Sequence, residues 1–116
     1  MLLPDELKIY LRLEPTDMRK SIDTLAIVVS DILKLDPSSG HLFLFRNRTG
    51  DKLKALYYKQ NCFTLWYRRL ERGRFVFPKE KSGHIELSTD HFKWLLASDK
   101  YSNSGAMAEI NYESFY

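Results

Sequence analysis

Hydrophobic and polar positions alternate strictly from Leu7 to Leu13, where four aliphatic residues are separated by polar or aromatic ones. This period of two is typical of a β-strand with one face over a core and the other face toward solvent. Glu14 and Pro15 follow the last aliphatic residue and end the predicted strand. The chain therefore opens with one half-buried strand.

A stripe of apolar residues with helical spacing comes next, and it predicts an amphipathic helix over Lys20 to Leu35. Thr16 or Asp17 is the expected N-cap, and the run from Asp36 to Gly40, with the sequence DPSSG, ends the helix. We expect this helix to pack on the first strand, because each has one apolar face in need of a partner. The residues predicted to be buried are Ile22, Leu25, Val29, Ile32, Leu11 and Phe43.

The middle of the chain shows strand patterns separated by turn residues. The first run, Leu42 to Phe45, is apolar at every position and predicts a strand buried on both faces. Further runs with aromatic and β-branched residues span Leu53 to Tyr58, Cys62 to Leu70, and Phe75 to Phe77. We predict a meander of three or four antiparallel strands, bent near Gly73.

The last predicted elements are a short edge strand over His84 to Leu87 and a short helix that begins after Ser88. Together the elements predict a single small α+β domain over residues 1–98. Its antiparallel sheet of four to six strands carries one long helix on one face and a short C-terminal helix. Residues 99–116 are rich in Ser, Asn and Gly, so we expect a tail that is loosely ordered or dependent on a partner.

Positive charge is concentrated between His41 and Arg74, where nine Lys and Arg face only two acids. The remaining residues carry nine basic and thirteen acidic side chains, so the net charge of +3 hides a basic centre. Guanidinium groups pair well with phosphate, so this segment predicts a nucleic-acid interface. The predicted contact residues are Arg46, Arg48, Lys52, Lys54, Arg68, Arg72 and Arg74.

Two groups of neighbours are left out of this interface. Strand alternation places Arg69 on the face opposite to Arg68, so we expect Arg69 to pair with an acid of the fold. Phe63, Leu65 and Tyr67 fall on one face and are expected to be core residues, although unpaired bases could also stack on such rings.

Catalytic and metal-binding patterns are weak. Three histidines and the single Cys62 lack metal-ligand spacing, and the acids form no pair suited to acid–base catalysis. The sequence contains no phosphate-binding glycine loop. We therefore predict a protein that is not an enzyme and has no cofactor, metal or small-molecule substrate.

Cys62 lies within a strand pattern and is expected to be a buried structural thiol. A single cysteine fits the reducing cytoplasm. No apolar run is long enough to span a membrane, and the first residues lack a secretory hydrophobic region. These patterns predict a cytoplasmic protein without a membrane partner.

Three motifs resemble those of one protein family. They are Pro15 to Lys20 (PTDMRK), Asp36 to Phe43 (DPSSGHLF) and Arg68 to Phe75 (RRLERGRF). The same order and spacing occur in TnpB-type proteins, products of the second open reading frame in the insertion-sequence-sixty-six family of bacterial transposable elements. The resemblance covers Leu7 to Leu96. One departure is Gln60-Asn61, where the family commonly has a turn of the Asp-Gly type.

The resemblance implies an accessory role in transposition, beside a separate and larger transposase that cleaves and joins DNA. Two interpretations stay open at this point. The protein could bind DNA, such as the ends of the element, through its basic centre, or it could be a protein-interaction subunit that assembles with the transposase without binding DNA. Clustering of the nine central basic residues on the fold would favour DNA binding, and dispersal would favour the second interpretation.

Overall fold

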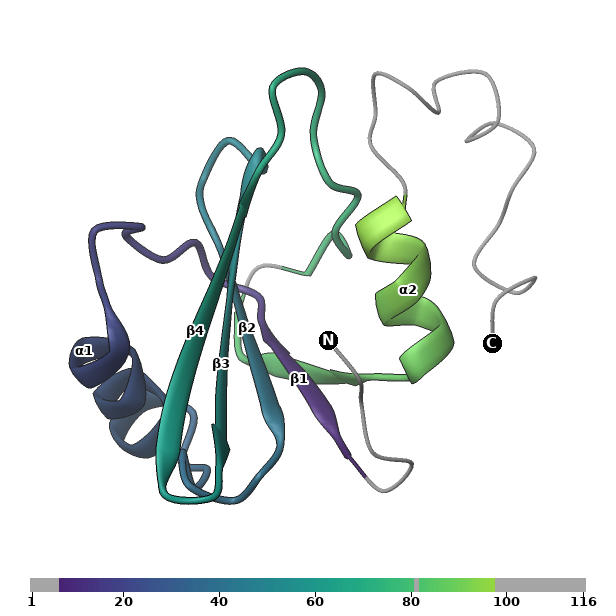
Figure 1. Cartoon of the computed structure of the whole chain (residues 1–116). Coiled ribbons are helices and arrows are strands. Elements are labelled where there is room, and N and C mark those ends of the chain that lie inside the picture. Colours follow the sequence, from purple (N-terminus) through teal and green to yellow (C-terminus); the bar gives the residue numbers. More distant parts are fainter. Residues whose placement is uncertain (1–6, 81, 98–116) are drawn as a thin grey trace.

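Five strands form one mixed sheet in the order β4-β3-β2-β1-β5 (Figure 1). The computed structural model describes residues 7–80 and 82–97. Within these ranges the strands are β1 (Ile9–Arg12), β2 (Leu42–Arg46), β3 (Lys52–Lys59), β4 (Cys62–Arg69) and β5 (His84–Leu87). The helices are α1 (Ile22–Ile27), η1 (Val28–Ile32) and α2 (Thr89–Ala97).

The combination of one sheet with helices confirms the predicted α+β class. The strand directions show that the prediction of an antiparallel sheet is wrong, because the sheet is mixed. β1 and β2 are parallel, whereas β2, β3 and β4 pair antiparallel and β5 runs antiparallel to β1. The helical segment between β1 and β2 acts as a crossover, which returns the chain in the same direction. Residue alternation carries no information on strand direction. The predicted strand at Phe75–Phe77 is also wrong, because this segment forms no strand.

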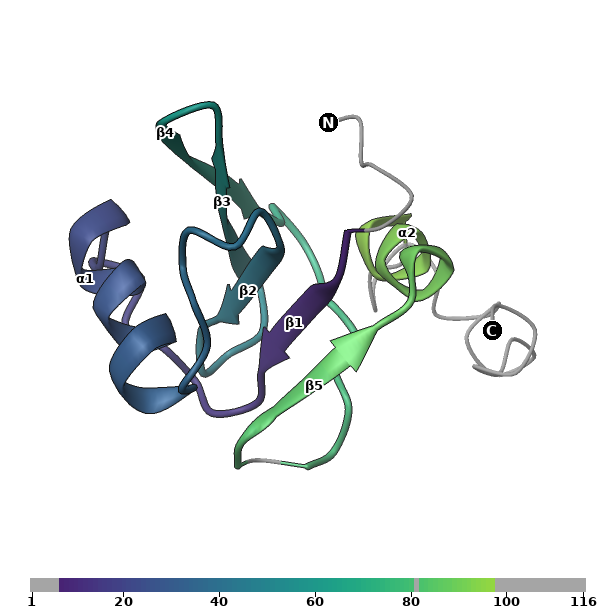
Figure 2. The same ribbon diagram turned by 90° about the horizontal axis from the view of Figure 1, so that it is seen from below.

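The central strand β2 is buried on both faces, as predicted. Leu42 and Leu44 join a core cluster on the α2 side of the sheet, and Phe43 and Phe45 join a second cluster on the α1 side. Figure 2 shows α1 and α2 on opposite sides of the sheet. A helix therefore covers each face, where the sequence predicted a helix on one face.

The aliphatic face of β1 packs against α2. Ile9 and Leu11 share a cluster with Phe92 and Leu95 of α2. The prediction that the first helix covers this face is wrong, because α1 lies on the face that carries Phe43. The aliphatic side chains of β1 thus pack against α2, whereas the apolar face of α1 packs against Phe43 and Phe45 of β2.

The predicted long helix is a short α-helix followed by a π-helix. Its N-cap is Ser21, whose backbone N–H donates to Thr24 Oγ1 at 2.9 Å, and not Thr16 or Asp17. A π-helix turns less per residue than an α-helix, so the apolar stripe leaves its expected line. Ile32 is consequently 56% exposed, against the prediction, while Val28 is buried.

Several smaller features follow the sequence more closely. β5 and α2 form as predicted, and Ser88 Oγ accepts a hydrogen bond from His91 N at 3.0 Å at the start of α2. Gln60 and Asn61 have φ values of 51° and 62° and make a two-residue turn between β3 and β4. Cys62 is exposed at the start of β4, so the prediction of a buried thiol is wrong. The predicted tail, 99–116, lies outside the described residues.

No helix among residues 7–80 and 82–97 is long and apolar enough to cross a membrane.

Candidate nucleic-acid interface

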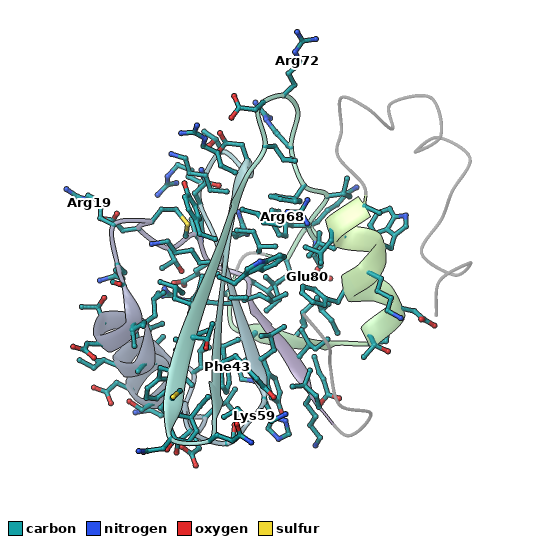
Figure 3. The ribbon with its side chains drawn as sticks, in the orientation of Figure 1. Arg19, Phe43, Lys59, Arg68, Arg72 and Glu80 are labelled. Carbon is teal, nitrogen blue, oxygen red and sulfur yellow. The ribbon has the colours of Figure 1, made fainter. Side chains whose placement is uncertain are left out.

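One end of the sheet gathers most of the central basic residues. β2 ends at Arg46, the antiparallel strand β3 begins at Lys52, and β4 ends at Arg69. The turn between β2 and β3 and the loop after β4 therefore lie at the same end of the sheet. Lys59, at the far end of β3, lies at the opposite end (Figure 3).

We call this region the basic end. Its cations come from the loop before α1, the β2–β3 turn, the end of β4 and the loop that follows. Figure 3 shows Arg72 at the outermost point of that last loop. The cations of the basic end are Arg19, Arg48, Lys52, Arg68, Arg69, Arg72 and Arg74, all of them exposed except Lys52, which is half-buried.

The β2–β3 turn is fixed by one asparagine. Asn47 Oδ1 accepts hydrogen bonds from the N–H groups of Gly50 and Lys52, both at 3.0 Å. Asn47 Nδ2 donates to Asp51 Oδ1 at 2.6 Å, and Thr49 Oγ1 donates to the same oxygen at 2.8 Å. These bonds lower the pKa of the Asp51 carboxyl. The turn therefore presents its basic side chains from a well-ordered backbone.

Gly50 joins this turn to the loop after β4. Its carbonyl accepts the Phe75 N–H at 2.8 Å, and its φ of +79° lies in the region that favours glycine. A Cβ at this position would approach the Arg74 Cβ to 3.8 Å. The close backbone contact brings the basic residues of the turn and of the loop together.

Three cationic side chains attach the segment 13–20, which carries the PTDMRK motif, to the sheet. Arg12 Nη1 donates to Thr16 Oγ1 at 3.1 Å, and Arg46 Nη2 donates to the carbonyl oxygen of Leu13. Lys54 Nζ donates to two further carbonyl oxygens in this segment, as described below. Cationic donors make strong hydrogen bonds with carbonyl oxygens, so the segment is held at several points along its length.

Lys54 makes the most extensive of these attachments. Its ammonium donates to the carbonyl oxygens of Met18 at 2.6 Å and Lys20 at 2.7 Å, and it lies 5.4 Å from the centre of the Tyr67 ring. Lys54 is only 9% exposed and Arg46 only 8%. Burial, followed by repulsion from Arg48, lowers the pKa of the Arg46 guanidinium.

Burial distinguishes Arg46 and Lys54 from the other residues of the predicted interface. Both charged groups are engaged by backbone carbonyls within the fold, so they are poorly placed to meet phosphate. The sequence offered no signal for this, because the carbonyl oxygens of Leu13, Met18 and Lys20 that bind them lie 33 or more positions away along the chain. We leave both residues out of the interface proposed below.

Asp17 and Arg19 form an ion pair within the PTDMRK motif. Arg19 Nη2 and Nε donate to Asp17 Oδ2 at 2.6 and 3.0 Å, and the Arg19 backbone N–H donates to Oδ1 at 2.9 Å. The guanidinium holds the pKa of the Asp17 carboxyl well below its usual range. The Arg19 side chain is 92% exposed, so it still presents its remaining donors to solvent.

A cleft of about 610 Å³ lies between the PTDMRK segment and the β2–β3 turn. One wall is the segment from Pro15 to Arg19, and the other is Asn47 to Thr49 together with Lys52. Tyr67 of β4 completes the lining. Its side chain is 47% exposed, so the prediction that Tyr67 is a core residue is wrong, whereas Phe63 and Leu65 are half-buried against the α1 side.

The two arginines at the end of β4 diverge as predicted. Arg68 lies opposite Leu53 on the α2 side of the sheet, with its guanidinium carbon 5.5 Å from the centre of the Trp66 ring. Arg69 pairs with Glu71 at 3.3 Å, which confirms its expected engagement by an acid. Both partners of that pair are exposed, so the pair contributes little to stability.

The carboxylates near the basic end are each bound by other side chains of the protein. Asp17 pairs with Arg19, Glu71 pairs with Arg69, and Asp51 accepts bonds from the β2–β3 turn. Within residues 7–80 and 82–97, no group of three or more His, Cys, Asp or Glu side chains is placed to hold a metal ion. The exposed guanidinium groups of the basic end can bind anions, and the exposed Tyr67 ring can contact a flat apolar group.

Comparison with known proteins identifies the family. The model of the IS66 Orf2-like proteins matches residues 7–105, which is most of the chain. The chain belongs to the IS66 Orf2-like family. Two Sinorhizobium fredii (strain NBRC 101917 / NGR234) proteins, both called uncharacterized, are similar to it. They are y4hO, 38% identical over 90 residues, and y4jC, 33% identical over 91 residues, with 78% of each chain covered in both cases. No solved structure matches the chain significantly.

Membership confirms the resemblance carried by the three motifs and makes this IS66 Orf2-like protein an accessory protein associated with an insertion sequence. The structure adds that two of the motifs meet at the basic end. The PTDMRK segment lines the cleft, and the RRLERGRF motif supplies the end of β4 and the loop after it. Arg19 belongs to the PTDMRK motif but was not among the contact residues predicted from the sequence. Its position within that motif was the one sequence feature that could have pointed to it.

Proposed function

We propose that this protein binds DNA directly through its basic end and acts as an accessory factor of transposition, together with a separate and larger transposase. The family supports the accessory role. The observation that carries the DNA-binding part is the placement of Arg48, Lys52, Arg68, Arg69, Arg72 and Arg74 at one end of the sheet. Six of the nine central cations thus share one region, although three different segments supply them.

The clustering of these cations favours DNA binding for an electrostatic reason. Phosphates of duplex DNA are closely spaced, so a surface that neutralises several of them gains affinity by releasing counterions. Acids at the basic end offset part of its charge, since Glu71 and Asp17 each pair with an arginine. Arg48, Lys52 and Arg74 have no acidic partner among the described ion pairs, and they leave the basic end positive.

The proposal does not assign cleavage or joining of DNA to this protein. The transposase would perform both steps, and the accessory protein would bring DNA or position it. We also propose that the protein acts in the bacterial cytoplasm, because the DNA of an insertion sequence is there.

Charge removal at the basic end tests the DNA-binding proposal. Replacing Arg72 and Arg74 by Ala should weaken binding of a duplex carrying the element's end several-fold, with the melting temperature almost unchanged, because both side chains are exposed. The matched control replaces Lys8 and Lys59, two exposed lysines at the other end of the sheet, and should leave affinity within about twofold. Equal losses in the two double variants would contradict the proposal.

A second candidate function is a protein-interaction subunit that does not bind DNA. The observation that favours it is the solvent-facing side of the helical segment, where Ile27 and Ile32 are 55% and 56% exposed. A variant of this surface separates the two functions. If the wild-type protein binds no duplex, yet replacing Ile27 and Ile32 by Ser abolishes capture of the transposase, the interaction function is correct.

A further inference from the structure

The cleft beside Tyr67 combines three features that the binding of duplex DNA alone does not require. It is a concave space of about 610 Å³, its lining includes the exposed ring of Tyr67, and three cations, Arg19, Arg48 and Lys52, also line it. A duplex presents its phosphates on the outside and keeps its bases stacked, so the exposed loop with Arg72 and Arg74 could contact it without any cleft.

We propose that the cleft receives one unpaired nucleotide of single-stranded DNA, with its base against Tyr67 and its phosphate against Arg48 and Lys52. This inference rests on the proposed function, since it names the form of DNA that the basic end takes. The volume of about 610 Å³ lies within the usual range for pockets that hold small organic groups.

Tyr67 supplies the surface for the base. Tyr67 is 47% exposed at the wall of the cleft, whereas Leu65, two positions earlier on the same face of β4, is half-buried. The Lys54 ammonium, 5.4 Å from the ring centre, helps to fix the orientation of the ring. Stacking on an aromatic side chain accepts any of the four bases, because every base has a flat face.

Arg48 and Lys52 supply the charge for the phosphate. Both line the cleft from the β2–β3 turn, whose backbone is fixed by Asn47. Among the described residues Asp17 is the only acid in the lining, and its charge is offset by Arg19. Asp17 would repel a phosphate near the PTDMRK wall, so the phosphate belongs on the wall formed by the turn.

The Asp17–Arg19 pair gives the opposite wall a mixed character. Arg19 retains free donor positions beyond those used by Asp17, and the carboxylate can accept hydrogen bonds. These groups suit the polar edge of a base better than a second phosphate. The cleft thus has a stacking surface, a phosphate wall and a polar wall, which are the three parts that one nucleotide needs.

The test compares three DNA probes and three proteins. Binding is measured by fluorescence anisotropy for a twenty-nucleotide thymidine strand, for the same strand with abasic sites at every position, and for a duplex of equal length. The proteins are the wild type, Tyr67→Ala and Tyr67→Phe. We expect Tyr67→Ala to lose roughly tenfold in affinity for the thymidine strand, and less than twofold for the duplex. Tyr67→Phe should retain wild-type affinity, because it keeps the ring.

The abasic strand isolates the base from the phosphates. The wild-type protein should bind it about as weakly as Tyr67→Ala binds the thymidine strand, and Tyr67→Ala should show no further loss. A Tyr67→Ala protein that loses affinity equally for strand and duplex, or for neither, would overturn the inference while leaving DNA binding intact. If the wild-type protein binds none of the three probes, the proposed function itself fails, so the two failures are distinguishable.

Discussion

Replacing Lys54 by Met isolates the attachment of the PTDMRK segment to the sheet. Lys54 Nζ makes two short hydrogen bonds to carbonyl oxygens of this segment, at 2.6 and 2.7 Å, and the residue is 9% exposed. Methionine keeps the length and most of the volume of the side chain, so the cavity term is small. The variant therefore removes the ammonium and leaves the packing largely in place.

The expected cost follows from the bonds lost. A hydrogen bond with a charged partner contributes roughly 1.5–3 kcal/mol, and the contact with the Tyr67 ring adds about 0.5–1 kcal/mol. Water can reach part of the freed carbonyls, and methionine avoids the cost of burying a charge, so the losses do not add fully. We expect Lys54→Met to lower the free energy of unfolding by about 2–3 kcal/mol, a large share of a typical 5–15 kcal/mol.

Lys52→Met is the matched control for this variant. Lys52 lies two residues earlier in β3 and is half-buried, and its side chain makes none of the hydrogen bonds described for residues 7–80 and 82–97. The same change of residue type there should cost less than about 0.5 kcal/mol. Lys52→Met should instead weaken DNA binding, because Lys52 lines the cleft.

Urea unfolding and thermal melting measure the difference. For a domain of this size the loss in Lys54→Met corresponds to a fall in melting temperature of roughly 8 °C or more. Hydrogen exchange should be faster at the amides of residues 15–20 than in wild type, since their attachment is weakened. Equal stability of Lys54→Met and Lys52→Met would contradict this prediction and would show that the segment is held to the sheet without the ammonium.

Two further predictions concern the carboxylates. Arg19 lowers the pKa of the Asp17 carboxyl, so the stabilisation from this ion pair is present above the unfolded pKa near 3.8 and is lost as pH falls through the folded pKa. Below about pH 4 the melting temperature should therefore decline less with falling pH in Asp17→Asn than in wild type. An identical decline in both proteins would contradict a stabilising role of the ion pair. Purified protein with magnesium or manganese should neither nick nor join DNA carrying the element's ends, because Asp51, Glu71 and Asp17 are engaged by other side chains. Metal-dependent cleavage that survives purification and disappears when one of these acids is replaced would contradict this prediction.

Periodicity in the sequence was enough to locate most elements of the fold. The alternation of Leu7 to Leu13 and the apolar run of β2 place two buried strands correctly, because burial acts directly on residue type. The same information does not encode strand direction or the face that a helix covers. Parallel pairing of β1 with β2 and the docking of α1 on the Phe43 face were therefore missed.

Ile32 shows a second limit. The apolar stripe predicts its burial only if every turn of the helix is an α-turn. The π-helix at Val28–Ile32 changes the angle between successive side chains, and Ile32 points to solvent. No residue pattern in the stripe distinguishes these two geometries.

The candidate site was predicted in outline, not in detail. Charge density located the basic segment, and strand alternation correctly separated Arg68 from Arg69. Lys54 was assigned the wrong environment, because its ammonium is buried by carbonyl oxygens more than thirty residues away. Tyr67 was also assigned the wrong environment, since it lines a cleft whose opposite wall is the distant PTDMRK segment. Long-range contacts of this kind leave no local trace in the sequence.

Salt dependence of duplex binding is the most direct test of the central claim that the basic end contacts DNA phosphates. The logarithm of the binding constant should fall linearly with the logarithm of the salt concentration, by roughly 0.9 slope units for each phosphate contact. We predict a slope of roughly −3 to −4 for wild type and for the Lys8 and Lys59 control, and a slope smaller in magnitude by about 2 for the Arg72 and Arg74 double variant. A wild-type slope near zero, or the same slope in all three proteins, would contradict it.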